Sequence, residues 1–260
     1  MKAPAFAYAK PASLAEALDL LARPGAKVLA GGQSLIPALN MRLSSPELLV
    51  DILGISGLKT IEVKNGMVRV GALVTHSEIE KSSDVKTHIP LLAQAAPHIA
   101  HPAIRNRGTL GGSLALADPA AEYPACAVAL DAVFLLKGLR GERRVKASQF
   151  FKGLFETDLK AGEILVAAEF PVSKKGDRSV FLELVRRQGD YATVGLAAHN
   201  ERVVFFAVGS TPVLFSLGDA RKSLKEKLQP TPDLYNSAET KRHLAGVLLE
   251  RAWNTLSTSR

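Results

Sequence analysis

The stretch IRNRGTLGGSLALADP, residues Ile104–Pro119, combines two arginines, three glycines and a closing Asp-Pro corner. Glycine has no Cβ, so its backbone can lie close to a ligand and adopt a positive φ without strain. Consecutive exposed amides in such a stretch can hold an anion such as a pyrophosphate. A lone Gly-Gly pair more often marks a tight turn between packed elements, and that alternative stays open for this stretch taken by itself.

A second glycine turn lies far upstream, in KVLAGGQSLIPAL, residues Lys27–Leu39. A short apolar run precedes Gly31-Gly32, and apolar residues recur at helical spacing after Ser34, which stands at an N-cap position. A strand, a glycine turn and a helix N-terminus together offer free N–H groups and a positive dipole end to phosphate. The spacing matches neither G-x-G-x-x-G nor the P-loop. The two stretches together favour a phosphorylated cofactor that is bound by neither of these two common motifs.

Around these turns the pattern predicts short alternating elements. A helix is expected over 11–23, with Ser13 as cap and Glu16 three residues later, and a small β-α-β unit over 27–52 follows it. Asn65-Gly66 indicates a hairpin. The elements expected up to residue 171 are strands over 27–30, 48–52, 58–63, 67–73, 132–136, 143–146 and 162–170, helices over 34–43, 77–81, 90–99 and 120–130, and a loop or short helix over 150–155.

The pattern changes after residue 176, where strands come first and helices follow. Strands are expected over 179–187, 193–199 and 202–208, and helices over 218–228 and 237–256. This order is typical of a separate small α+β domain.

Composition excludes several classes of protein. The chain has 260 residues, enough for one large or two modest domains. A single cysteine, Cys126, excludes internal disulfides and Cys-ligated iron–sulfur clusters. The net charge is +8, but aromatics are 6% and do not interleave with basic residues, which speaks against nucleic-acid binding. No segment resembles a membrane span or a signal core, so we expect a cytoplasmic protein.

Few side chains indicate catalysis by the protein itself. His98 and His101 are three apart, but prolines interrupt that helix and no acidic residue completes a metal set, so we expect no metal site. No nucleophile motif occurs. Asp118 and Glu122 are four residues apart. They either stabilise a helix N-terminus as acids of its first turn or accept hydrogen bonds from ribose hydroxyls, and both interpretations stay open.

Three segments together resemble a known family: AGGQSLIPALNMRL, IRNRGTLGGSLALADPAAEYPA and RRQGDYATVGLAA. They are similar to the medium, FAD-binding subunit of molybdenum hydroxylases, the aerobic carbon monoxide dehydrogenase and xanthine dehydrogenase family. The resemblance implies an α+β protein with a PCMH-type FAD-binding fold over 1–175, built from two α/β subdomains of about 1–57 and 58–175. A C-terminal α+β domain over 176–260, with a three-stranded antiparallel sheet and helices, would follow.

The resemblance also implies which residues contact FAD. The two glycine stretches would hold the pyrophosphate, Asp118 and Glu122 would lie near the nucleotide end, and Tyr191 would lie against the isoalloxazine. The full set implied is Ala30, Gly31, Gly32, Gln33, Ser34, Thr109, Leu110, Gly111, Gly112, Ser113, Asp118, Glu122, Ile164, Leu165 and Tyr191. The chain departs from the family pattern at Leu116, often a polar residue, and at Glu183, often a lysine.

The implied function is electron transfer by FAD. In the family, a large subunit with a molybdenum cofactor hydroxylates the substrate, and a small subunit with 2Fe–2S clusters delivers electrons to this FAD. The flavin passes them to an external acceptor, and the complex is expected to be a dimer of heterotrimers. Two alternatives stay open: a self-sufficient FAD-dependent oxidoreductase, and a flavin-free assembly or docking subunit.

Overall fold

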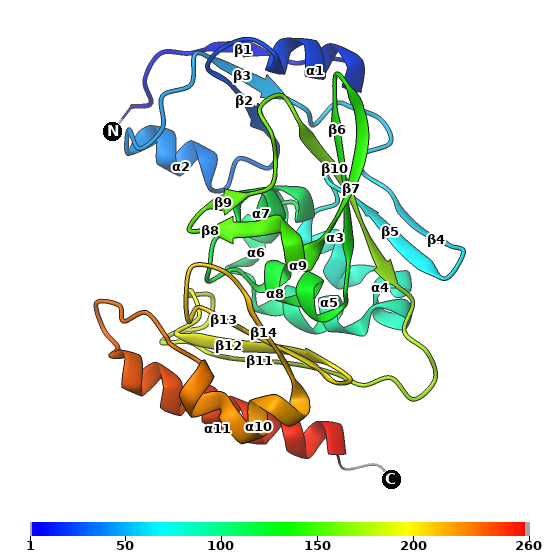
Figure 1. Ribbon diagram of the computed structural model, residues 1–260. Helices are drawn as coiled ribbons and strands as arrows, with labels where there is room; N and C mark the ends of the chain where they lie inside the picture. Colours follow the sequence, from blue (N-terminus) through cyan, green and yellow to red (C-terminus); the bar gives the residue numbers. More distant parts are fainter. Residues whose placement is uncertain (1, 258–260) are drawn as a thin grey trace.

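The first part of the chain forms a three-stranded parallel sheet with strand order β1-β3-β2 (Figure 1). The computed structural model describes residues 2–257. The helix expected over 11–23 is confirmed, and the Ser13 hydroxyl caps it by accepting the Glu16 N–H at 3.2 Å. The sequence does not predict the first strand, because it is three residues long and has no buried face. The elements are β1 (Ala7–Ala9), α1 (Leu14–Leu21), β2 (Ala26–Leu29), α2 (Leu35–Asn40) and β3 (Leu48–Asp51).

A five-stranded antiparallel sheet follows, with strand order β4-β5-β10-β6-β7. Asn65 at φ +52° and Gly66 at φ +75° form the predicted hairpin turn, which needs positive φ at both positions. The apolar strand expected over 162–170 is confirmed as the central strand of this sheet. The strands are β4 (Ile61–Lys64), β5 (Met67–Gly71), β6 (Val133–Gly138), β7 (Gly141–Lys146) and β10 (Ile164–Pro171).

Short helices pack beneath this sheet (Figure 1). Thr75 caps the first of them in a complete capping box, in which Glu78 N–H donates to the Thr75 hydroxyl and Thr75 N–H donates to the Glu78 carboxylate. The expectation of a loop or helix over 150–155 is wrong, because residues 151–153 form a strand. The elements are α3 (His76–Lys81), α4 (Ser83–His88), α5 (Pro90–Ala95), η1 (Ala96–His98), α6 (Pro102–Arg105), α7 (Leu110–Leu116), α8 (Glu122–Ala129), α9 (Ala147–Phe150), β8 (Phe151–Gly153) and β9 (Glu156–Thr157).

The C-terminal part is a four-stranded antiparallel sheet with two helices on its outer face (Figure 1). The expected three strands are present, but a fourth pairs with the last of them, so the prediction of a three-stranded sheet is one strand short. The elements are β11 (Ser179–Leu184), β12 (Val194–His199), β13 (Arg202–Phe206), β14 (Val213–Ser216), α10 (Leu217–Lys227) and α11 (Ala238–Ser257). Across residues 2–257 no helix combines the length and the apolar composition needed to cross a bilayer.

Three apolar cores join these layers. One lies between α1, the parallel sheet and one face of the five-stranded sheet. The largest lies between the other face of that sheet, the short helices and the inner face of the C-terminal sheet, which contributes Phe181 and Phe206. The third lies between the outer face of the C-terminal sheet and helices α10 and α11. The C-terminal sheet therefore shares a core with the part of the chain before residue 176.

Candidate functional site

The two glycine stretches lie against each other. A Cβ added to Gly31 would be 2.1 Å from the carbonyl oxygen of Arg107 and 3.0 Å from the Cα of Gly108. Because real side chains never approach backbone atoms this closely, glycine is required at position 31 for the two loops to meet. The loop after β2 and the loop before α7 thus form one surface, next to α2, α6 and α7 in Figure 1.

The first glycine loop has free backbone donors. Within the described part of the chain, the N–H groups from Gly31 to Ser34 donate no hydrogen bond. Ser34 is exposed and stands at the N-cap of α2, but its hydroxyl makes no capping bond, so the predicted N-cap position holds without the predicted side-chain cap. Gln33 closes the turn by donating from Nε2 to the Gly31 carbonyl at 3.1 Å. These amides are available to an anion at the start of α2.

The second glycine loop differs, because its amides already have partners. Leu110 and Gly111 donate to the carbonyls of Val74 and Ala72, both at 2.9 Å, and Gly112 and Ser113 donate to the hydroxyl and carbonyl of Thr109 at 3.1 and 3.0 Å. The expectation of free consecutive amides is therefore wrong for these four residues.

Gly111 has a packing reason of its own. Its Cβ would lie 2.5 Å from the Ala72 Cβ, so glycine there lets α7 dock beside the end of β5. Gly112 is exposed and Ser113 is partly exposed. Ligand contact by these residues stays a prediction.

The two arginines of this stretch have different environments. Arg105 is largely buried, where its Nε donates to Glu80 at 2.9 Å and its Nη1 donates to the carbonyls of Ile99 and Ala100, both at 3.2 Å. Arg107 is exposed, and its own backbone forms the contact with Gly31. Of the two arginines, Arg107 is therefore the one whose charge remains available beside the free amides. Arg105 instead stabilises the preceding loop through its hydrogen bonds.

Asp118 and Glu122 lie at the start of α8. Asp118 accepts the Ala120 N–H at 2.9 Å, and burial raises its pKa. Glu122 is in the first turn of α8 and 8% exposed. Burial, followed by the charges of Glu183 and Asp118, raises the pKa of Glu122 to about 8. The helix-terminus interpretation is confirmed for Glu122 and is wrong for Asp118, which lies before the N-cap Ala121 and bonds to the connection instead. Contact of either residue with ribose hydroxyls stays a prediction.

Tyr191 is 72% exposed on the loop between β11 and β12. Partial desolvation, followed by the charges of Asp118 and Glu122, raises the pKa of Tyr191. Gly189 holds the loop in place, at φ +85° and close to His101, whose Cε1 would be 2.5 Å from an added Cβ. The loop that carries this exposed aromatic ring is thereby packed against His101.

Ile164 and Leu165 are buried on opposite faces of β10. They are 3% and 4% exposed, Ile164 in the core with α1 and Leu165 in the core with α7 and α8. Contact of either residue with a flavin ring stays a prediction. Leu116, at the last position of α7, is partly exposed.

Glu183 and His98 form a pair that the sequence does not suggest. The Glu183 side chain is 3% exposed, and its Oε1 lies 3.0 Å from His98 Nδ1. The two residues are far apart in the chain, and a histidine next to Pro97 suggests at most a surface or metal role. The departure at Glu183 thus places a buried acid, rather than a solvated charge, beside His98.

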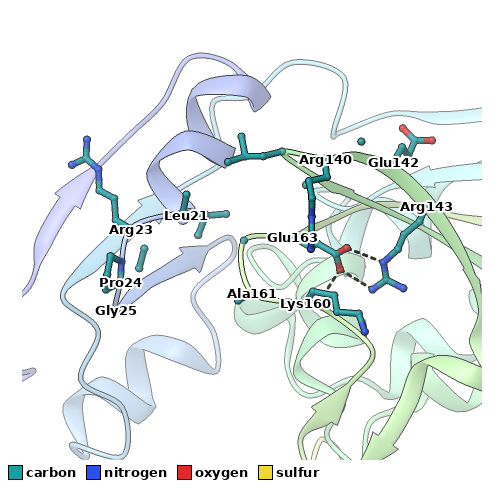
Figure 2. Close-up of a pocket in the computed structure, with 16 residues that line it drawn as sticks. Leu21, Arg23, Pro24, Gly25, Arg140, Glu142, Arg143, Lys160, Ala161 and Glu163 are labelled. Atoms are coloured by element: carbon teal, nitrogen blue, oxygen red, sulfur yellow. Dashed lines mark hydrogen bonds and ion pairs between the residues drawn. The ribbon is translucent and has the colours of Figure 1, made fainter.

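A cavity lies elsewhere in the structure. It has a volume of about 770 Å³ and lies between the turn after α1, the tip of the β6–β7 hairpin and the loop before β10 (Figure 2). In it Arg143 is held by Glu163 at 2.7 Å and by Asp158 at 2.5 Å. Its lining includes none of the residues predicted to bind FAD, so the glycine loops and this cavity are separate features.

Fold and site define a class of protein: an α+β chain in which two glycine loops meet, the first with free amides, with an exposed arginine and an exposed tyrosine on nearby loops. Residues 4–173 match the family described as the FAD binding domain in molybdopterin dehydrogenase. The chain belongs to this family, so its recognition as an FAD-binding medium subunit, and as an oxidoreductase subunit, is confirmed.

Several relatives match nearly the whole chain. The nicotine 6-hydroxylase medium subunit of Paenarthrobacter nicotinovorans is 39% identical over 99% of this chain and 89% of its own length. The carbon monoxide dehydrogenase of Hydrogenophaga pseudoflava, in a form that lacks the Mo-pyranopterin moiety, has a chain with a TM-score of 0.94 and 34% identity, covering 98% of both chains. Quinoline 2-oxidoreductase from Pseudomonas putida 86 has a chain with a TM-score of 0.92 and 37% identity over the same shares.

Proposed function

We propose that this chain holds FAD across the meeting point of its glycine loops and transfers electrons within a molybdenum hydroxylase complex. The observation that carries the site is the run of free amides from Gly31 to Ser34 beside the exposed Arg107. Backbone donors at a helix start and a nearby cation suit a pyrophosphate. When bound, FAD supplies the redox chemistry, which is why the chain needs no acid or base of its own.

The remaining predicted residues fit around that anchor. Ser113 and the exposed Gly112 would border the pyrophosphate, and Asp118 and Glu122 would face the nucleotide end. Tyr191 would cover the isoalloxazine, because its aromatic ring is exposed. The buried Ile164 and Leu165 would support the ring from β10.

The partners are those that the family resemblance implies, and the single cysteine of this chain fits them. Iron–sulfur clusters need several thiolates, so the clusters that feed this FAD would lie on a small subunit, and the molybdenum cofactor on a large one. Electrons would leave the flavin for an external acceptor. We further propose a dimer of heterotrimers.

Isolation of the complex tests this organisation. The chain, tagged at one end and expressed in its own host, should co-purify with a larger and a smaller polypeptide, with molybdenum, iron and FAD in fixed ratios by metal analysis and absorbance. Recovery of the chain alone, with FAD but without molybdenum or iron, would support the self-sufficient oxidoreductase instead. The complete complex without flavin would support the docking subunit. The relatives are named as subunits, and these names favour neither the self-sufficient oxidoreductase nor the flavin-free docking subunit.

A further inference from the structure

His76, the first residue of α3, packs against the second glycine loop. Its backbone N–H donates to the Gly108 carbonyl at 3.0 Å, and the preceding Thr75 pairs with Thr109 in an antiparallel bridge. A Cβ added to Gly108 would lie 2.7 Å from both Cδ2 and Nε2 of His76. The His76 ring therefore occupies the space that a side chain at position 108 would need.

Gly108 is also a residue through which the second loop reaches the first. A Cβ added to Gly31 would lie 3.0 Å from the Gly108 Cα, as well as 2.1 Å from the Arg107 carbonyl oxygen. His76, Gly108 and Gly31 thus lie in a continuous row of contacts that runs from the start of α3 to the first glycine loop. Because protein interiors are close-packed, a change on one side of Gly108 is felt on the other.

The surroundings of the His76 ring favour its uncharged form. The residue is 5% exposed, and its Nδ1 is buried without a hydrogen-bond partner among the described residues. The ring packs edge-on against Tyr123 of α8, with 5.2 Å between ring centres, and the charge that acts on it is that of Arg105 of α6, which Glu80 binds. Burial, followed by the Arg105 charge, lowers the pKa of His76 from 6.5 to about 4. A protonated ring carries an N–H at both nitrogens, so it would bury an N–H at Nδ1 that has no acceptor.

We propose that His76 is a positioning residue for FAD, because its uncharged ring fills the space beside Gly108 and thereby keeps the second glycine loop against the first. His76 acts through Gly108 and Gly31, without contacting the cofactor itself. Residues that contact a ligand hold their geometry only when a supporting layer packs behind them, and His76 belongs to that layer. This inference rests on the proposed function.

An exchange of space between the two residues tests the inference, with the FAD affinity of the full chain as the readout. Gly108 has no positive φ, so alanine brings no backbone strain there. Gly108→Ala places a methyl group against the His76 ring, and this overpacking should weaken FAD binding about tenfold. His76→Ala opens that space and should weaken binding as well. In the double variant the methyl group enters the space that the ring has left, so binding should be tighter than in Gly108→Ala alone.

The pH profile gives a second readout, which lost packing alone would not change. When the loops separate, His76 returns to its ordinary pKa of 6.5, so the joined loops lose stability as pH falls from 6.5 to about 4. FAD binding by the wild type should therefore be constant above pH 6.5 and weaken across that window. His76→Gln keeps an uncharged side chain, so it should bind FAD at pH 7 and show a smaller loss in acid. His243→Ala, at an exposed histidine of α11, is the matched control and should follow the wild type.

The outcomes separate the inference from the function on which it rests. Additive losses in the double variant, or an acid loss that is unchanged in His76→Gln, would overturn the inference while FAD binding stands. If Ser34→Asp, with a charge on the first loop, binds FAD as the wild type does, the proposed site fails and the inference fails with it. Circular dichroism shows whether each variant folds. If Gly108→Ala does not fold, the pH profile of His76→Gln decides.

Discussion

At the scale of single residues, the glycines of the two loops matter because they have no Cβ. Gly31 lets one loop lie on the backbone of the other, and Gly111 lets α7 pack on Ala72. Family resemblance assigns both to cofactor binding, yet in the structure both first allow two pieces of backbone to meet. Close backbone contacts at these two glycines therefore shape the site.

Gly111→Ala should therefore destabilise the fold. The new methyl group would lie 2.5 Å from the Ala72 Cβ, and such overpacking costs about 1–3 kcal/mol. Gly246→Ala is the control, because Gly246 lies inside α11 with no atom within 4 Å of an added Cβ. It should stabilise the protein by up to about 1 kcal/mol. Urea unfolding measures both, and equal stability of Gly111→Ala and wild type would contradict the packing account.

Glu122 should make stability depend on pH even without cofactor. Its pKa is raised from 4.5 to about 8, so the folded state binds a proton that the unfolded state has released between those values. Stability should therefore fall as pH rises through that window, by at most roughly 5 kcal/mol. Glu122→Gln should be more stable than wild type at pH 9 and should lose that advantage near pH 4.5. Thermal unfolding across pH checks it, and a constant difference would count against a buried, protonated Glu122.

At the scale of elements, the loop between β11 and β12 presents Tyr191. Gly189→Ala would place a methyl group at φ +85° and 2.5 Å from the His101 ring, so the loop that carries Tyr191 must move away from His101. Bound flavin should then become more fluorescent, as it should in Tyr191→Ser, although Gly189→Ala keeps the tyrosine. Tyr191→Phe retains the ring and should change the fluorescence little. Unchanged quenching in both Gly189→Ala and Tyr191→Ser would remove Tyr191 from the flavin site.

Elements with a local signal could be predicted from the sequence. Three such signals lie within the elements that they predict: Asn65-Gly66 in its hairpin, the Ser13 cap at its helix and the apolar run in β10. Each of these predictions is confirmed. β1 and β14 carry no such signal, because they are short and exist through pairing with β3 and β13. The same reason applies to the site. Its glycine motifs can be read locally, but the Gly31–Arg107 contact and the His98–Glu183 pair come from tertiary packing.

At the scale of the whole molecule, the shared core argues against independent halves. Phe181 and Phe206 of the C-terminal sheet pack with α5 and α8, which belong to the earlier part of the chain. The division into 1–175 and 176–260 stays a prediction from the sequence. A fragment of residues 1–175 should expose that core, bind a hydrophobic dye and lack a cooperative thermal transition. A fragment that unfolds cooperatively near the full-length midpoint would mean that the core is dispensable.

The most direct test of the central claim is an FAD titration of the full chain, followed by absorbance, with two variants at one exposed position. Ser34→Asp places a negative charge at the free amides of the first loop, and Ser34→Asn has the same size without the charge. We predict flavin bands near one equivalent for wild type, comparable binding for Ser34→Asn, and at least tenfold weaker binding for Ser34→Asp. Equal binding by all three would place the FAD pyrophosphate away from the first glycine loop.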